Sequence, residues 1–178
     1  NNEMLGLDLH WRGLGRTSFE AQLALDDFYF QRRYENRDRY AVTLAALGPL
    51  GARAAWRAFY TQVSSLALRT FDPSESFTDA GVGVGRNFSD NDQLTATLTM
   101  PINTHWLLTP ELTMLRQGEG AIDDPYPPFG SPELQATPTL FIGTVERTYR
   151  AAIGISGRPG PIDLTANAGF HHVVNSGH

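Results

Sequence analysis

The 28 residues from 93 to 120, QLTATLTMPINTHWLLTPELTMLRQGEG, alternate apolar and polar side chains on both sides of a Pro-Ile-Asn-Thr break. The apolar positions of the first half, which alternate with threonines, are Leu94, Ala96, Leu98 and Met100. Successive side chains of a β-strand point to opposite faces, so a period of two predicts strands. The stretch therefore predicts a hairpin with one threonine face and one apolar face, and the apolar face meets either a protein core or lipid.

The same period runs through most of the chain and predicts an all-β fold, because no segment has the pattern of a helix of three turns. The predicted strands are 4–12, 17–29, 38–47, 51–68, 93–102, 108–117, 138–156 and 161–174. Two residues interrupt the alternation: Arg147 falls on the apolar parity, and Pro110 lies at the start of a strand.

Composition excludes several classes of protein. The net charge of -5 and the pI near 5.5 argue against a nucleic-acid partner, which favours a basic face. The chain has no cysteine, which excludes disulfides and thiolate metal sites. No apolar run approaches the roughly 18 residues that a membrane-spanning helix needs.

The connections between predicted strands alternate in length. Short ones are expected at 13–17, 48–51, 103–107 and 156–161, and long polar ones at 30–39, 70–92 and 118–137. Tight turns on one side and long loops on the other are typical of an antiparallel up-and-down transmembrane β-barrel. A soluble sandwich with Greek-key crossings has no reason to keep this alternation.

The two faces of the predicted strands differ in the same sense. The apolar face has aromatic residues at expected strand ends, where a barrel places its interfacial girdles: Trp11, Phe19, Tyr40, Tyr60, Trp106 and Phe170. The opposite face is small, polar or charged, and its predicted lumen-lining residues are Asp8, Glu20, Arg53, Arg57 and Arg150. Alternation alone leaves open a soluble sandwich or a lipocalin-like barrel whose apolar face points inward.

Several segments resemble a known family. They are WRAFYTQVSSLALRTFDP (56–73), GRNFSDNDQLTATLTM (85–100), LTPELTMLRQGEG (108–120) and the opening GLDLHWRGLGRTSFEAQLALDDF (6–28). Together they are similar to the Wzi-like capsule-assembly proteins of the Gram-negative outer membrane, over about residues 6–120. The resemblance implies a large β-barrel in the bacterial outer membrane that holds or helps to assemble surface polysaccharide, with no catalytic residues to carry over.

Barrels of that family have many more than eight strands. We therefore expect residues 1–178 to form a single β-barrel segment, a fragment that lacks N-terminal strands and the final C-terminal strand or strands. The alternative is that the even number of eight strands closes into a small barrel by itself.

The sequence offers little sign of catalysis or metal binding. His171 and His172 are adjacent and would point to opposite faces of a strand, so they cannot easily share one ion. Ser176 has no evident partner for nucleophilic catalysis. The acidic groups 90–92 and 123–124 lack the spacing of a calcium loop, and we interpret them as solvated surface acids. The prediction is a protein that is not an enzyme, without metal or cofactor.

The remaining candidates are aromatic residues in the long loops, which can stack on sugars: Tyr34, Phe77, Tyr126 and Phe129. The predicted partners are outer-membrane lipid and surface polysaccharide, with no nucleic acid. Two other functions stay open at this point. One is a general porin or channel tuned by the lumen-lining charges, and the other is a soluble β-sandwich binding module.

Overall fold

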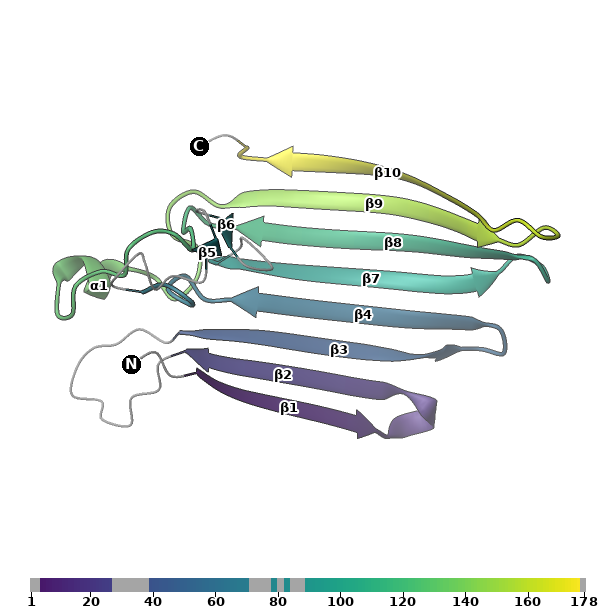
Figure 1. Ribbon diagram of the computed structural model, residues 1–178, viewed down its shortest axis with the longest axis horizontal. Helices are drawn as coiled ribbons and strands as arrows, with labels where there is room; N and C mark the ends of the chain where they lie inside the picture. The colour runs from purple at the N-terminus through teal and green to yellow at the C-terminus, as the bar shows by residue number, and fades with distance from the viewer. Residues whose placement is uncertain (1–3, 27–38, 71–77, 80–81, 84–88, 177–178) are drawn as a thin grey trace.

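The computed structural model describes residues 4–26, 39–70, 78–79, 82–83 and 89–176. Most of them belong to one sheet of eight antiparallel strands, arranged side by side in chain order (Figure 1). The strands are β1 (Met4–Arg12), β2 (Ser18–Asp26), β3 (Tyr40–Leu50), β4 (Ala54–Val63), β7 (Asn91–Pro101), β8 (Trp106–Gln117), β9 (Glu146–Gly157) and β10 (Leu164–Val174). A separate two-stranded ladder pairs β5 (Thr78–Asp79) with β6 (Val82–Gly83).

This topology confirms the all-β, up-and-down prediction. Every strand of the large sheet pairs with its neighbour in the sequence of sheet strands, so the described residues form one meander and not two packed sheets. The soluble sandwich is therefore wrong as a description of the fold. β1 and β10 pair with each other nowhere in the described ranges, so the alternative of a closed eight-stranded barrel is also wrong for this structure.

The predicted alternation of short and long connections is confirmed. Short turns join β1 to β2, β3 to β4, β7 to β8 and β9 to β10 at one end of the sheet. The longer connections, which link these pairs to one another, start and finish at the other end (Figure 1). We call these the short-turn end and the loop end. The first turn is a 3-10 segment, Leu14–Arg16, in which Gly15 has a φ of 60°. The only α-helix of the described residues, α1 (Pro132–Ala136), lies at the loop end, and none of the described helical segments is long and apolar enough to cross a membrane.

Some predicted boundaries were wrong, all of them beside a turn or a loop. The strand expected from 51 to 68 is β4, which starts at Ala54 and ends at Val63, and the strand expected from 138 begins only at Glu146. After Val63 the chain leaves the sheet because Ser64 closes it off, donating its N–H to the carbonyl of Tyr40 and accepting the N–H of Tyr40 on its hydroxyl. Helix α1 begins where Ser131 caps the N–H of Leu134 at 3.0 Å.

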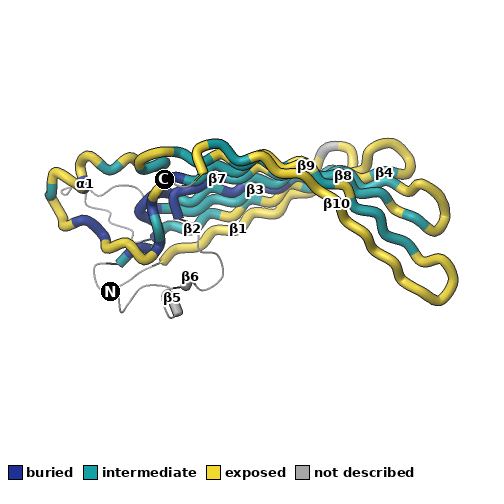
Figure 2. The backbone as a smooth tube through the Cα atoms, turned by 90° about the horizontal axis from the view of Figure 1, so that it is seen from above, coloured by how far each residue is buried: buried dark blue, intermediate teal, exposed yellow. Residues whose placement is uncertain are grey.

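Burial is concentrated at the loop end. Figure 2 shows dark blue segments mainly there, whereas the short-turn end is almost entirely exposed. The one apolar cluster of fully buried side chains in the described ranges comprises Leu66, Tyr126 and Leu134, all from the connections and none from the sheet. The sheet therefore has no core of its own on either face among these residues.

Candidate functional site

One face of the sheet, the apolar face, carries most of the large hydrophobic side chains of the eight strands. The register aligns them in rows, and one row runs Leu9, Ala21, Leu44, Tyr60, Leu94, Met114, Tyr149 and His172. Leu112 is 65% exposed and Phe170 is 71% exposed, so no described segment covers this face. At about 4.8 Å between strands and about 36 Å along an 11-residue strand, the face measures on the order of 1,200 Å², beyond the few hundred Å² of apolar patch usual on a soluble monomer.

Aromatic residues of the apolar face are sorted by type along the strands. All three tryptophans lie near the short-turn end: Trp11 stacks on Phe19 with ring centroids 5.4 Å apart, and the others are the third residue of β4 and the first of β8. Tyr40, Tyr60 and Tyr149 lie nearer the loop end. The alternation of the sequence places Trp56 and Tyr149 on the apolar face, but the predicted girdle aromatics did not include them. Phe170, expected at a strand end, lies in the middle of β10.

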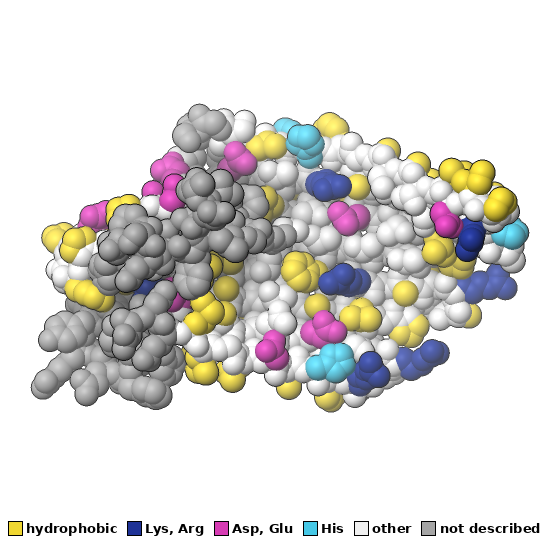
Figure 3. All heavy atoms as spheres, viewed as in Figure 1, with side chains coloured by type: hydrophobic (Ala, Val, Ile, Leu, Met, Phe, Trp, Pro, Cys, Tyr) yellow, Lys and Arg dark blue, Asp and Glu magenta, His cyan; other side chains and the backbone are white. Residues whose placement is uncertain are grey.

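The opposite face is polar, and the register places Asp8, Glu20, Arg57 and Arg150 on it as predicted. Arg53 was expected there too, but it lies in the turn before β4. In Figure 3, which views this face, acidic and basic side chains alternate across the middle of the sheet.

Threonine hydroxyls link neighbouring strands of the polar face. Thr95 and Thr113 are 3.0 Å apart, and Thr43 and Thr61 are 3.4 Å apart. A hollow of about 300 Å³ on this face is lined by eight side chains, namely Arg57, Phe59, Gln93, Thr95, Thr97, Glu111, Thr113 and Arg150. The polar side chains around this hollow can form hydrogen bonds with water or with a polar ligand, and the described residues form no apolar core on this face.

The histidine interpretation agrees with the register. His171 pairs with Arg150 on the polar face and His172 pairs with Tyr149 on the apolar face, so the two rings point to opposite sides. Within 4–26, 39–70, 78–79, 82–83 and 89–176, no three His, Asp or Glu side chains are close enough to hold a metal ion.

At the loop end, Asp90 organises a buried polar cluster. Its carboxylate has no exposed surface and accepts backbone N–H groups from Gly120 at 3.2 Å, Ile142 at 2.8 Å and Phe141. Asn91 and Asp92 are each only 2% exposed. The interpretation of residues 90–92 as solvated acids was therefore wrong: the carboxylate of Asp90 joins the β4–β7 connection to the β8–β9 connection through backbone hydrogen bonds that compensate its desolvation.

The packing of this cluster explains why positions 118 and 120 are both glycine. A Cβ at Gly118 would lie 2.0 Å from Oδ2 of Asp90, and one at Gly120 would lie 2.6 Å from a guanidinium nitrogen of Arg69. Glu119, between them, accepts the N–H of Thr144 at 2.9 Å. Only glycine permits so close an approach of the backbone to a buried carboxylate.

A pocket of about 530 Å³ opens beside the cluster. It is lined by Arg69, Glu119, Asp124 and Glu133 together with prolines and short side chains of the 118–143 segment. Arg69 is 4% exposed, and one of its terminal nitrogens lies 3.2 Å from Asp124, while its Nε has no hydrogen-bond partner in the described residues. Burial lowers the pKa of Arg69, and the neighbouring carboxylates of Asp124, Asp90 and Asp123 oppose that shift.

Of the four loop aromatics predicted to bind a ligand, the structure describes two, Tyr126 and Phe129. Tyr126 is 4% exposed, with the guanidinium carbon of Arg39 4.8 Å from its ring centroid, so it is packed inside the loops and does not offer a ring to a ligand. Phe129 is 49% exposed and lies 5.9 Å from Tyr126 between centroids. Tyr34 and Phe77 lie outside the described residues.

No family model, curated protein or solved structure matches the chain. The resemblance to the Wzi-like proteins therefore stays a prediction.

Proposed function

We propose that this chain is a segment of a transmembrane β-barrel of the bacterial outer membrane, with its apolar face against lipid and its polar face toward the barrel interior. The observation that carries the proposal is the continuous, uncovered apolar face across all eight strands. The grouping of tryptophans and tyrosines toward opposite ends of that face supports it, because both residues favour the boundary between hydrocarbon and water.

Strand length and register fit a span. A strand of 11 residues is about 36 Å long and, at tilts of roughly 25–45°, covers about 25–33 Å, comparable to the hydrocarbon thickness. The cross-strand row at Trp11 lies one residue before the end of β1 and reaches Phe170, six residues after the start of β10. This stagger of five residues runs in one direction, as barrel closure requires, although its slope of roughly 25° is shallower than in most closed barrels.

The free edges of β1 and β10 bear on the size of the barrel. Each has nine or more residues and one side without a strand partner among the described residues. Unpaired backbone groups are very costly in hydrocarbon, so further strands must complete the ring. This supports the expectation of a larger barrel of which the chain forms a part.

At the loop end we propose binding of surface polysaccharide, without catalysis. The pocket beside Asp90 offers carboxylates and a guanidinium, which can accept from and donate to sugar hydroxyls, and Phe129 presents an exposed ring. The resemblance to the capsule-assembly family points to the same ligand. A channel is the second candidate, because charges of both signs, Arg57, Glu111 and Arg150, surround the hollow of the polar face.

The first test is spin-label accessibility along β7 in liposomes. We expect oxygen accessibility to peak at Leu94, Ala96, Leu98 and Met100 and to fall at the threonines between them. Shielding of the apolar positions with water-exposed threonines would place a protein core on the apolar face and end the membrane proposal.

The second test separates the two candidate functions. Phe129→Ala should lower retention of capsular polysaccharide on cells while leaving the sheet folded, and Ile102→Ala, exposed at the short-turn end, is the matched control. Equal retention by all three proteins would contradict the glycan site. A steady single-channel current in planar bilayers, altered by Arg57→Gln, would favour the channel instead.

A further inference from the structure

Two arginines face each other on the apolar side of the sheet. Arg116 of β8 and Arg147 of β9 are direct cross-strand partners, and both have the parity of the apolar face. Side chains directly opposite each other in a ladder have Cβ atoms about 5 Å apart, where like charges destabilise a sheet. The pair therefore needs a negative charge beside it.

Asp92 supplies that charge to Arg116 alone. Its carboxylate accepts the Nε of Arg116 at 2.9 Å and a second hydrogen bond from a terminal nitrogen, and it is itself only 2% exposed. Arg147 is exposed and has no ion pair with any carboxylate of the described residues. Arg116, Arg147 and Asp92 together therefore carry a net charge of +1, and the uncompensated charge is that of the exposed Arg147.

A chain of hydrogen bonds on the apolar face lies at about the same position along the strands as Arg147. Gln62 donates to the hydroxyl of Tyr40 at 2.6 Å and accepts from that of Tyr60 at 2.7 Å, and the same Tyr60 hydroxyl lies 3.4 Å from Asp92. Tyrosines with bonded hydroxyls typically lie at the headgroup level of a membrane. Arg147 continues this polar line at the depth of lipid phosphates.

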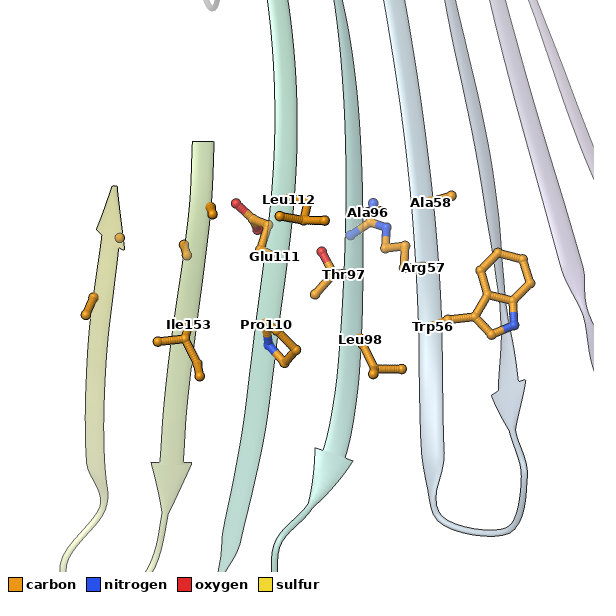
Figure 4. Close-up of a pocket in the computed structure, with 14 residues that line it drawn as sticks. Trp56, Arg57, Ala58, Ala96, Thr97, Leu98, Pro110, Glu111, Leu112 and Ile153 are labelled. Carbon is orange, nitrogen blue, oxygen red and sulfur yellow. The ribbon is translucent and has the colours of Figure 1, made fainter. Parts of the chain in front are cut away.

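Below the arginines the apolar face is hollowed. A depression of about 830 Å³ extends over β4, β7, β8, β9 and β10, and its lining includes Trp56, Leu112 and the small side chains of Ala58, Ala96 and Ala151. Figure 4 shows Ala58 and Ala96 in the hollow beside Trp56 and Leu112. Leu112 and Ala151 are cross-strand partners four residues from Arg116 and Arg147 respectively, about 13 Å along the strands. The charge and the hollow are therefore aligned on the same two strands.

We infer that β8 and β9 bind one anionic phospholipid or phosphorylated glycolipid, with its phosphate on Arg147 and an acyl chain in the alanine-lined hollow. The inference rests on the proposed membrane location. Free phosphate would meet the charge but leave the hollow empty, so the lipid is the occupant that both features select.

The test uses brominated lipids, which quench tryptophan on contact, and a full-length chain that keeps Trp56 of the hollow and carries Trp11→Phe and Trp106→Phe. In phosphatidylcholine vesicles, brominated phosphatidic acid should quench Trp56 at about fivefold lower mole fraction than brominated phosphatidylcholine, since one arginine near an anionic surface contributes about that factor. Arg147→Gln should abolish the preference, and Arg147→Lys should keep part of it. Arg150→Gln, on the polar face of the same strand, should leave it unchanged.

Quenching by brominated phosphatidylcholine separates the two ways of failing. If both lipids quench Trp56 equally well in the Trp11→Phe/Trp106→Phe protein with Arg147 intact, the apolar face contacts lipid but the specific lipid site is wrong. If neither lipid quenches it, the membrane proposal itself has failed. Loss of the preference on adding inorganic phosphate, at an ionic strength held constant, would also overturn the lipid assignment.

Discussion

The apolar face of the sheet and the cluster around Asp90 follow opposite rules of burial. On the sheet, many leucines and aromatic side chains are exposed, from 37% for Phe19 to 71% for Phe170, and the hydrogen bonds of the polar face link hydroxyls across strands. At the loop end, Asp90 and Arg69 are buried and their neighbours are glycines and serines. Buried charges need partners, whereas exposed apolar surface needs an apolar solvent, so the two regions are built for different surroundings.

The largest effect is expected at Asp90. Replacing it with alanine leaves the N–H groups of Gly120, Phe141 and Ile142 without their acceptor in a buried site, which should lower the free energy of unfolding by about 3–5 kcal/mol. Urea unfolding in detergent micelles measures this change. Asp123→Ala, which replaces an exposed acid in the connection between β8 and β9, should change it by less than about 0.5 kcal/mol. Equal effects of the two substitutions would remove the distinction between the regions.

A charge on the apolar face tests the other half of the comparison. Leu112→Arg, in the middle of that face, should destabilise the lipid-inserted protein by about 2–4 kcal/mol. Gln22→Arg, which would lie on the polar face opposite Asp8 and Thr43, should be nearly neutral. Unfolding titrations of both variants in vesicles measure the two changes, and equal stability of Leu112→Arg and the unsubstituted protein in vesicles would contradict a lipid-facing surface.

The cluster is also expected to resist added volume. Gly118→Ala would bring a methyl group against the carboxylate of Asp90 and should cost about 1–3 kcal/mol. Gly6→Ala in β1, where a Cβ meets nothing within 4 Å, is the matched control and should be neutral or slightly stabilising. Thermal unfolding followed by circular dichroism compares them, and identical midpoints would show that the loop end adapts freely.

The smallest change is expected on the polar face. Thr95→Val removes the 3.0 Å hydroxyl contact with Thr113 and should cost about 1 kcal/mol, the usual net value of one hydrogen bond. Chemical denaturation of Thr95→Val, Thr113→Val and the double variant isolates the coupling between the two hydroxyls. A coupling of zero would mean that water replaces the contact, as in an open interior.

Local sequence patterns predicted the sheet well, because the alternation of apolar and polar residues within a strand shows which side chains lie on each of its faces. The eight strands, their order and the alternation of connections all follow from a period of two and from loop length. The errors arose where a few residues keep the alternation after the strand has ended, as from Ser64 to Leu68, or where residues before β9 imitate it.

The cluster around Asp90 could not be predicted from such local patterns, because the residues in contact are far apart in the sequence. Asp90 bonds to residues 51 and 52 positions away, and nothing next to Asp90 reveals that its partners are the backbone of Phe141 and Ile142. Tyr126 was misjudged for the same reason, since Arg39 covers its ring from another connection. A usable signal did exist in the pair of glycines around Glu119, which marks a close approach of backbone.

If further strands complete a barrel, as proposed above, the directions of the two edge strands constrain how many strands are added. β1 runs from the loop end to the short-turn end, and β10 runs in the opposite direction. Strands added between them must alternate in direction so that every pair stays antiparallel. The number needed to complete the ring is therefore even, whether those strands come from the same chain or from another copy.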